Sequence, residues 1–101
     1  MQFQWRIIFI PNIFSPNGDN VNDYFTISGR PNLINIGYLR IYDRWGNQLF
    51  EKSDLTPGND QEGWDGTFNS QPMQPGVYVF VAELVYEDRS ETVKGEVTIV
   101  R

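Results

Sequence analysis

The side chains with the most capacity for chemistry are concentrated in one polar stretch, "SPNGDNVNDYF" at residues 15–25. Asn17, Asp19 and Asp23, with the main-chain carbonyl of Val21 between them, are spaced two residues apart like the oxygen ligands of a calcium loop. An EF-hand needs a glycine at its sixth position and a bidentate glutamate at its twelfth, and the count from Asn17 meets neither. The calcium hypothesis that remains is a shorter loop, completed by a carboxylate from another part of the chain.

The same stretch has a second interpretation that needs no ion. Asn and Asp side chains hydrogen-bond to nearby main-chain groups as Asx turns, while Gly18 and Asn20 tolerate a positive φ. Five residues suit this role: Asn17, Asp19, Asn20, Asn22 and Asp23. From its residues the stretch is therefore a shaped turn or a Ca²⁺ loop, two roles that can coexist, and no other cofactor is expected.

Two further motifs each place a tryptophan beside a glycine and an acidic residue: "DRWGN" at 43–47 and "EGWDGT" at 62–67. One interpretation is carbohydrate binding, in which the tryptophan faces stack on sugar rings. The other is packing, in which Trp45 and Trp64 cover open ends of the fold while their glycines shape turns. Packing is favoured for so small a domain. The residues concerned are Trp45, Gly46, Trp64, Asp65 and Gly66.

Composition argues against catalysis. Histidine and cysteine are both absent, which excludes zinc sites, thiol nucleophiles and Ser-His-Asp mechanisms. Carboxylates are numerous, but a glycosidase-like pair needs a deep cleft, for which a domain of 101 residues has little volume. We therefore expect no enzymatic activity.

Charge and hydropathy limit the partners. The net charge is −5 and the basic residues are scattered singly, which argues against nucleic acid and anionic membranes as partners. The longest apolar run falls far short of the roughly 20 residues of a membrane span, so no membrane insertion is expected. A monomer is the expected oligomeric state.

Apolar and polar residues alternate along much of the chain, as in half-buried strands. The expected strands span 3–9, 24–28, 37–43, 47–51, 76–87 and 92–101. Residues 77–82 are apolar at every position, which predicts a strand buried on both faces in the middle of a sheet. Gly46 is expected to take a positive φ in a hairpin turn, and 52–75 to be a long connection with at most one short strand around 64–68. Together these features predict an all-β fold, an Ig-like antiparallel two-sheet β-sandwich of about seven strands.

Five segments in order resemble a known family: "IPNIFSPNGDNVNDYF", "LRIYDRWGNQLFE", "GWDGTFN", "PGVYVFVAELVY" and "KGEVTIVR". They are similar to the gliding-motility-associated C-terminal domain, the type B sorting domain of the type IX secretion system of Bacteroidota. The resemblance divides the chain into a linker or first-strand segment at 1–9 and a C-terminal sorting domain at 10–101. At one position the family's loop has glycine where this chain has Asn20, and asparagine is the residue that best replaces glycine at a positive φ.

The resemblance implies a function and its partners. Such domains end large exported proteins and direct them through the outer-membrane translocon, by way of the periplasm, to the cell surface or the medium. The implied partners are the type IX secretion machinery and an N-terminal cargo domain. The chain is accordingly expected to be part of a longer protein, whose export signal lies upstream. The implied fold is again an Ig-like sandwich.

We expect the machinery to read three surfaces: the loop 15–23, the turn at Trp45 and Gly46, and the terminal strand 96–101 with Val100 and Arg101. An exposed terminal strand can be bound by strand addition, whereas a covered one cannot. The alternative function is a calcium-dependent Ig-like adhesion or carbohydrate-binding module, which would use the Asn/Asp loop and the two tryptophans.

Overall fold

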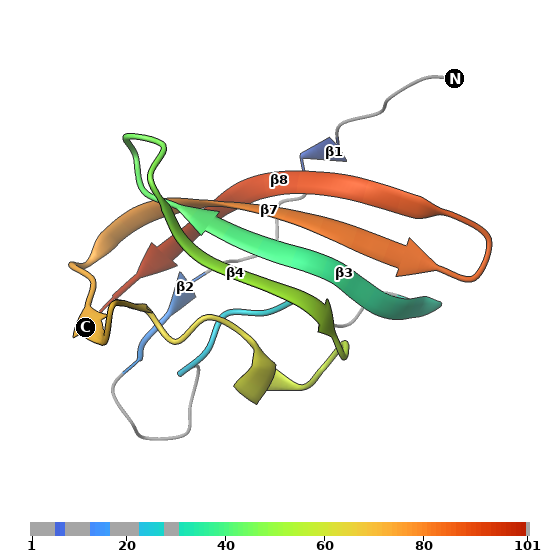
Figure 1. Cartoon of the computed structure of the whole chain (residues 1–101), viewed down its shortest axis with the longest axis horizontal. Coiled ribbons are helices and arrows are strands. Elements are labelled where there is room, and N and C mark those ends of the chain that lie inside the picture. Colours follow the sequence, from blue (N-terminus) through green and yellow to red (C-terminus); the bar gives the residue numbers. More distant parts are fainter. Residues whose placement is uncertain (1–5, 8–12, 17–22, 28–30, 101) are drawn as a thin grey trace.

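The computed structural model describes residues 6–7, 13–16, 23–27 and 31–100. Its elements are β1 (Arg6–Ile7), β2 (Ile13–Phe14), β3 (Leu33–Tyr42), β4 (Gln48–Leu55), the 3₁₀ turn η1 (Asp60–Glu62), β5 (Thr67–Phe68), β6 (Gln71–Pro72), β7 (Gly76–Tyr86) and β8 (Ser90–Ile99) (Figure 1). Strands dominate, which confirms the predicted all-β fold. In the described ranges no helix has the length and apolar character to cross a membrane.

The long strands form one sheet with the order β1-β8-β7-β3-β4, and β2 also pairs with β8. In Figure 1, β3, β4, β7 and β8 run together across the view, each antiparallel to its neighbour. A second, small sheet consists of β5 and β6, so the predicted two-sheet arrangement is confirmed. The pairing of β1 and β2 with β8 is parallel, which the antiparallel prediction did not include. A hairpin turn imposes antiparallel pairing, and no such turn joins these segments to β8.

Short pieces of chain make up the layer that covers this sheet. The expected strand at 24–28 is wrong in its described part, because residues 23–27 form only an isolated antiparallel bridge, between Phe25 and Trp64. The connection after β4 holds two strands of two residues each, β5 and β6, rather than at most one. Asn69 and Ser70, between the two strands, both have positive φ, 52° and 64°. They form the tight turn that lets β5 pair with β6.

β7 is the central strand, between β3 and β8, as predicted. Its inward residues are buried, but Val77 on the other face is 44% exposed and Val79 is half-buried. The prediction of full burial on both faces is therefore wrong. The covering layer packs on the inward face, where the rings of Phe25 and Phe80 lie 5.1 Å apart.

The hydrophobic core lies between the large sheet and the covering layer. Every side chain in it is apolar or aromatic, with no buried charged group among the described residues. Its fully buried side chains of largest volume come from both layers: Trp64, Phe80, Ile27, Ile36, Leu39, Ile41, Leu55, Leu84, Ile99, Val93 and Val97. Leu39 and Ile41 share the inward face of β3, as their alternation predicted.

Candidate recognition surface

The turn between β3 and β4 is held by the side chain of Asp43. Its Oδ1 accepts hydrogen bonds from the main-chain N–H groups of Trp45 and Asn47, both at 2.9 Å, and its Oδ2 accepts one from Asn47 Nδ2 at 2.9 Å. The main-chain N–H of Asp43 donates to the Asn47 carbonyl at 3.0 Å, and that of Gly46 donates to the Asp43 carbonyl at 3.1 Å. Gly46 has φ of 85°, as predicted. These bonds fix the turn in one conformation.

The electrostatics of the turn follow from the same bonds. The hydrogen bond from the Asn47 side chain lowers the pKa of Asp43 below its ordinary value, and the main-chain N–H groups of Asn47, Trp45 and Gly46 lower it further, against a smaller opposing effect of burial. Each of these donors favours the ionised carboxylate. Asp43 is therefore an anion at neutral pH whose oxygens are already occupied by donors from its own turn.

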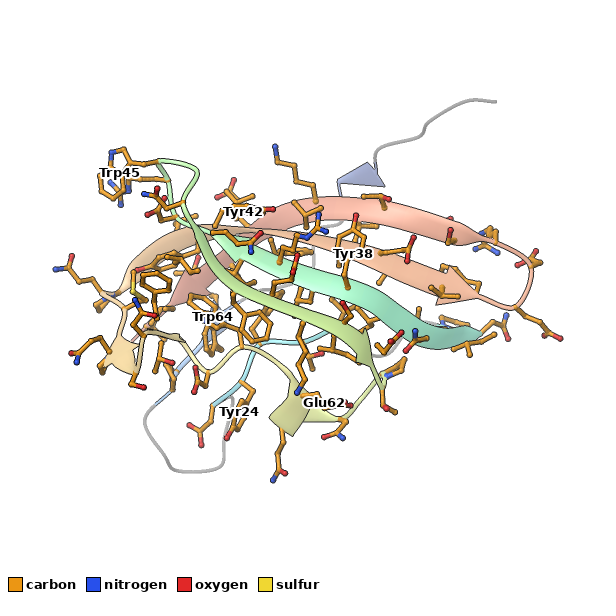
Figure 2. The ribbon with its side chains drawn as sticks, in the orientation of Figure 1. Tyr24, Tyr38, Tyr42, Trp45, Glu62 and Trp64 are labelled. Atoms are coloured by element: carbon orange, nitrogen blue, oxygen red, sulfur yellow. The ribbon has the colours of Figure 1, made fainter. Side chains whose placement is uncertain are left out.

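Trp45 projects from the tip of this turn. It is 78% exposed, and Figure 2 shows it apart from the body of the molecule. The Arg44 guanidinium lies 5.5 Å from the centre of its ring, a cation–π contact. The packing interpretation is therefore wrong for Trp45, because the hairpin carries it beyond the end of the core.

A pocket of about 220 Å³ lies at the base of this turn, and we name it the Trp45 pocket. Its lining residues are 43–45 of the turn and 73–78, which lead into β7. The pairing of Tyr42 with Val79 brings these two segments together. Tyr78 is held in the wall by its hydroxyl, which donates to the Gln74 carbonyl at 2.6 Å. Sequence reasoning missed this pocket, since the register between β3 and β7 has no local sequence signal.

The second tryptophan motif is structural. Trp64 is fully buried, and its ring lies 5.6 Å from that of Phe14 and 5.4 Å from that of Tyr78. Its Nε1 donates to the Thr67 carbonyl at 2.9 Å, which satisfies the only polar atom of the side chain. Asp65 Oδ1 accepts from the main-chain N–H and the hydroxyl of Thr67, at 3.1 Å and 2.7 Å. Packing is thus confirmed for Trp64.

This motif also holds both sides of the Asn/Asp loop. A Cβ built on Gly66, which has φ of 81°, would lie 2.9 Å from Pro16 Cγ, so that only glycine lets Pro16 pack there. Beyond the loop, Phe25 exchanges two main-chain hydrogen bonds with Trp64, at 2.8 Å and 2.9 Å. The segments before and after the loop are therefore anchored on neighbouring residues of one motif.

Most of the loop itself lies outside the described residues. This holds for the candidate ligands Asn17, Asp19 and Val21 and for the turn residues Gly18, Asn20 and Asn22. Asp23 is described and half-buried. Within the described part of the chain, no three acidic residues gather closely enough to hold a metal ion.

The terminal strand is covered on its outer side. β1 pairs with Val93 and Lys94, and β2 pairs with Thr98 and Ile99. Val100 is 40% exposed, but its main-chain N–H donates to the Phe14 carbonyl at 3.0 Å. Arg101 lies outside the described residues. At Thr98 to Val100 the strand edge is thus occupied, which argues against strand addition there.

The opposite edge of the sheet is protected by charge. β4 pairs with β3 alone in the described sheet, and its middle carries the exposed residues Glu51, Lys52 and Asp54. Asp54 has φ of 57°, which interrupts the regular strand. Charged side chains and an irregular backbone both disfavour pairing with another strand. Both described edges of the sheet are thus occupied or protected, whereas Trp45 at the tip of the turn is exposed and a pocket lies at its base.

Comparison with known proteins supplies the family. Residues 8–99 match a family described as the CHU_C type IX secretion signal domain. A search of curated proteins found no match. The matched range includes both tryptophan motifs, the Asn/Asp loop and all four long strands.

Proposed function

Because the chain belongs to the CHU_C type IX secretion signal domain family, we propose that it is a folded, non-catalytic signal that directs a larger cargo protein through the type IX translocon. The family match over residues 8–99 carries this proposal. The cargo precedes the domain in the chain, passes through the periplasm and reaches the cell surface or the medium. The machinery of the type IX system is the partner that reads the domain.

Two features support a signal that is read in its folded state. The segments flanking the Asn/Asp loop are held by Gly66 and Trp64, and the Trp45 turn is fixed by Asp43. Both surfaces thus depend on tertiary contacts or on a closed turn, which an unfolded chain would lack. The absence of histidine and cysteine from the sequence supports the non-catalytic part of the proposal.

Export of a reporter tests this function directly. Residues 1–101 are fused to the C-terminus of a periplasmic reporter enzyme in a bacterium that has a type IX system. We expect the reporter on the cell surface or in the medium, and in the periplasm when the translocon gene is deleted or the domain is omitted. A folded fusion that stays in the periplasm of the competent host would contradict the proposal.

Calcium binding by residues 17–23 is a second, separate proposal. The anchoring of Pro16 on Gly66 and of Phe25 on Trp64 supports it, because anchored ends reduce the entropy lost when a loop closes around an ion. A ligand that binds only the folded state raises the melting temperature. We expect millimolar Ca²⁺ to raise it for the native chain and not for Asp19→Asn. An unchanged melting temperature for the native chain rejects the proposal.

A further inference from the structure

We propose that the Trp45 pocket binds a short acidic–apolar segment of a protein partner, with an apolar side chain in the pocket and a carboxylate on Arg44. The inference rests on the proposed function in one respect only, the identity of the protein that carries this segment. The chemistry of the segment follows from the pocket.

The charge of the ligand follows from Arg44. Of the arginine side chains that the structure describes, Arg40 and Arg89 form ion pairs with carboxylates, whereas Arg44 forms none with a described residue. The carboxylate nearest in sequence, Asp43, accepts hydrogen bonds from its own turn instead. Arg44 therefore keeps donors for a ligand anion, and a guanidinium binds a carboxylate through two parallel hydrogen bonds.

The apolar part of the ligand follows from the walls of the pocket. Trp45, Met73, Pro75 and Val77 are among its lining residues and contribute apolar surface. Trp45 and Val77 are exposed in the free chain, at 78% and 44%, and their burial by a partner removes apolar surface from water. The volume of about 220 Å³ is below that of usual small-molecule sites, about 300–1,000 Å³, and suits one inserted side chain.

Gly76 lies next to Arg44 at the start of β7. A Cβ built on this residue would lie 3.9 Å from Arg44 Nη2, so the guanidinium lies over the bare backbone at the start of β7. The cation and the apolar wall are thus neighbours. A ligand needs its carboxylate and its apolar side chain only a residue or two apart to reach both.

These observations favour a peptide over a sugar. Carbohydrate sites combine an aromatic face with free carboxylate or amide groups for the hydroxyls. Here both Asp43 oxygens already accept hydrogen bonds from within the turn, so they are not free for sugar hydroxyls. Tryptophan and arginine are also the residues most enriched at the energetic centres of protein interfaces.

The test uses the whole chain and an array of hexapeptides in which aspartate and leucine or phenylalanine alternate, beside a matched array with asparagine for aspartate. We expect binding to the acidic array alone, and the tightest peptide to shift the NMR signals of Arg44, the Trp45 indole and Val77. Arg44→Gln and Trp45→Ala should each weaken the binding of that peptide at least tenfold without changing the melting temperature of the domain. Arg89→Gln, at the other end of the sheet, is the control and should leave the affinity unchanged.

Three results would overturn the inference: equal binding to the asparagine array, binding that survives Arg44→Gln, or no peptide binding at all. A glycan-array signal that depends on Trp45, without peptide binding, would replace the peptide with a sugar. The reporter fusion separates the two proposals. Failure of the native fusion to leave the periplasm contradicts the sorting function, while loss of peptide selectivity contradicts only the ligand assigned to the pocket.

Discussion

The two tryptophan motifs have nearly the same composition and opposite structural roles. Trp64 is fully buried between the covering layer and the sheet, whereas Trp45 is 78% exposed at the tip of a hairpin (Figure 2). Each has a neighbouring aspartate that accepts hydrogen bonds from residues of its own motif, Asp65 from Thr67 and Asp43 from Trp45 and Asn47. The local turn chemistry is thus shared, and the tertiary position decides between stability and recognition.

Replacing Trp64 should have the largest effect. Trp64→Ala removes the ring contacts with Phe14 and Tyr78 and leaves a cavity, at a cost of about 3–5 kcal/mol. Chemical denaturation measures this loss. Trp64→Phe is the matched control, since it keeps a ring but removes the donor to the Thr67 carbonyl, and should cost less. A loss of less than about 1 kcal/mol for Trp64→Ala would contradict the structural role.

The glycines that follow the two tryptophans, Gly46 and Gly66, should differ in how strongly their replacement destabilises the domain. Gly66 and Gly46 have nearly the same φ, 81° and 85°, so alanine at either position is strained by about 1–2 kcal/mol. Only at Gly66 does the added Cβ meet another residue, Pro16, which adds roughly 1–3 kcal/mol. We expect Gly66→Ala to destabilise more than Gly46→Ala in the same denaturation assay. Equal losses would mean that the contact with Pro16 contributes nothing.

The sequence alone predicts the strands better than it predicts which tryptophan is buried and which is exposed. Alternation placed Leu39 and Ile41 on one face of β3, and both are fully buried. The hairpin spacing of the two strands predicted a positive φ for the turn glycine, Gly46, and its φ is 85°. Those predictions depend only on neighbours in the chain.

The failures on the tryptophans, the parallel pairing and the pocket involve partners that are distant in sequence. Whether a tryptophan is buried depends on what faces it, and Trp64 faces Phe14, fifty residues earlier by number. The parallel pairing of β2 with β8 and the pocket between Arg44 and Val77 likewise depend on strand register. A periodic pattern fixes which face a residue is on but leaves that register open.

Acid should weaken the Trp45 turn through Asp43. Its pKa is lowered in the folded chain, so its stabilising contribution is complete above the ordinary value of 3.8 and is lost as the pH falls through the lower folded value. Asp43→Asn lacks this contribution at every pH. We expect the native chain to be more stable than the variant at pH 6, and the difference to shrink below the ordinary value. A difference that stays constant into strong acid would contradict an ionised Asp43 as the group that holds the turn.

Replacing Trp45 should have the smallest effect on stability and a large one on recognition. Its ring is mostly in water and its contact with Arg44 is exposed, so Trp45→Ala should change the free energy of unfolding by less than about 0.5 kcal/mol. If the partner reads this turn, the same variant lowers reporter export although its melting temperature is unchanged. Trp64→Phe provides the converse, a partly destabilised domain with an intact Trp45 surface. If export falls in Trp45→Ala but not in Trp64→Phe, recognition depends on the exposed tryptophan and not on the stability of the domain. If the Trp45→Ala fusion is exported as well as the native one, this turn is not part of the signal.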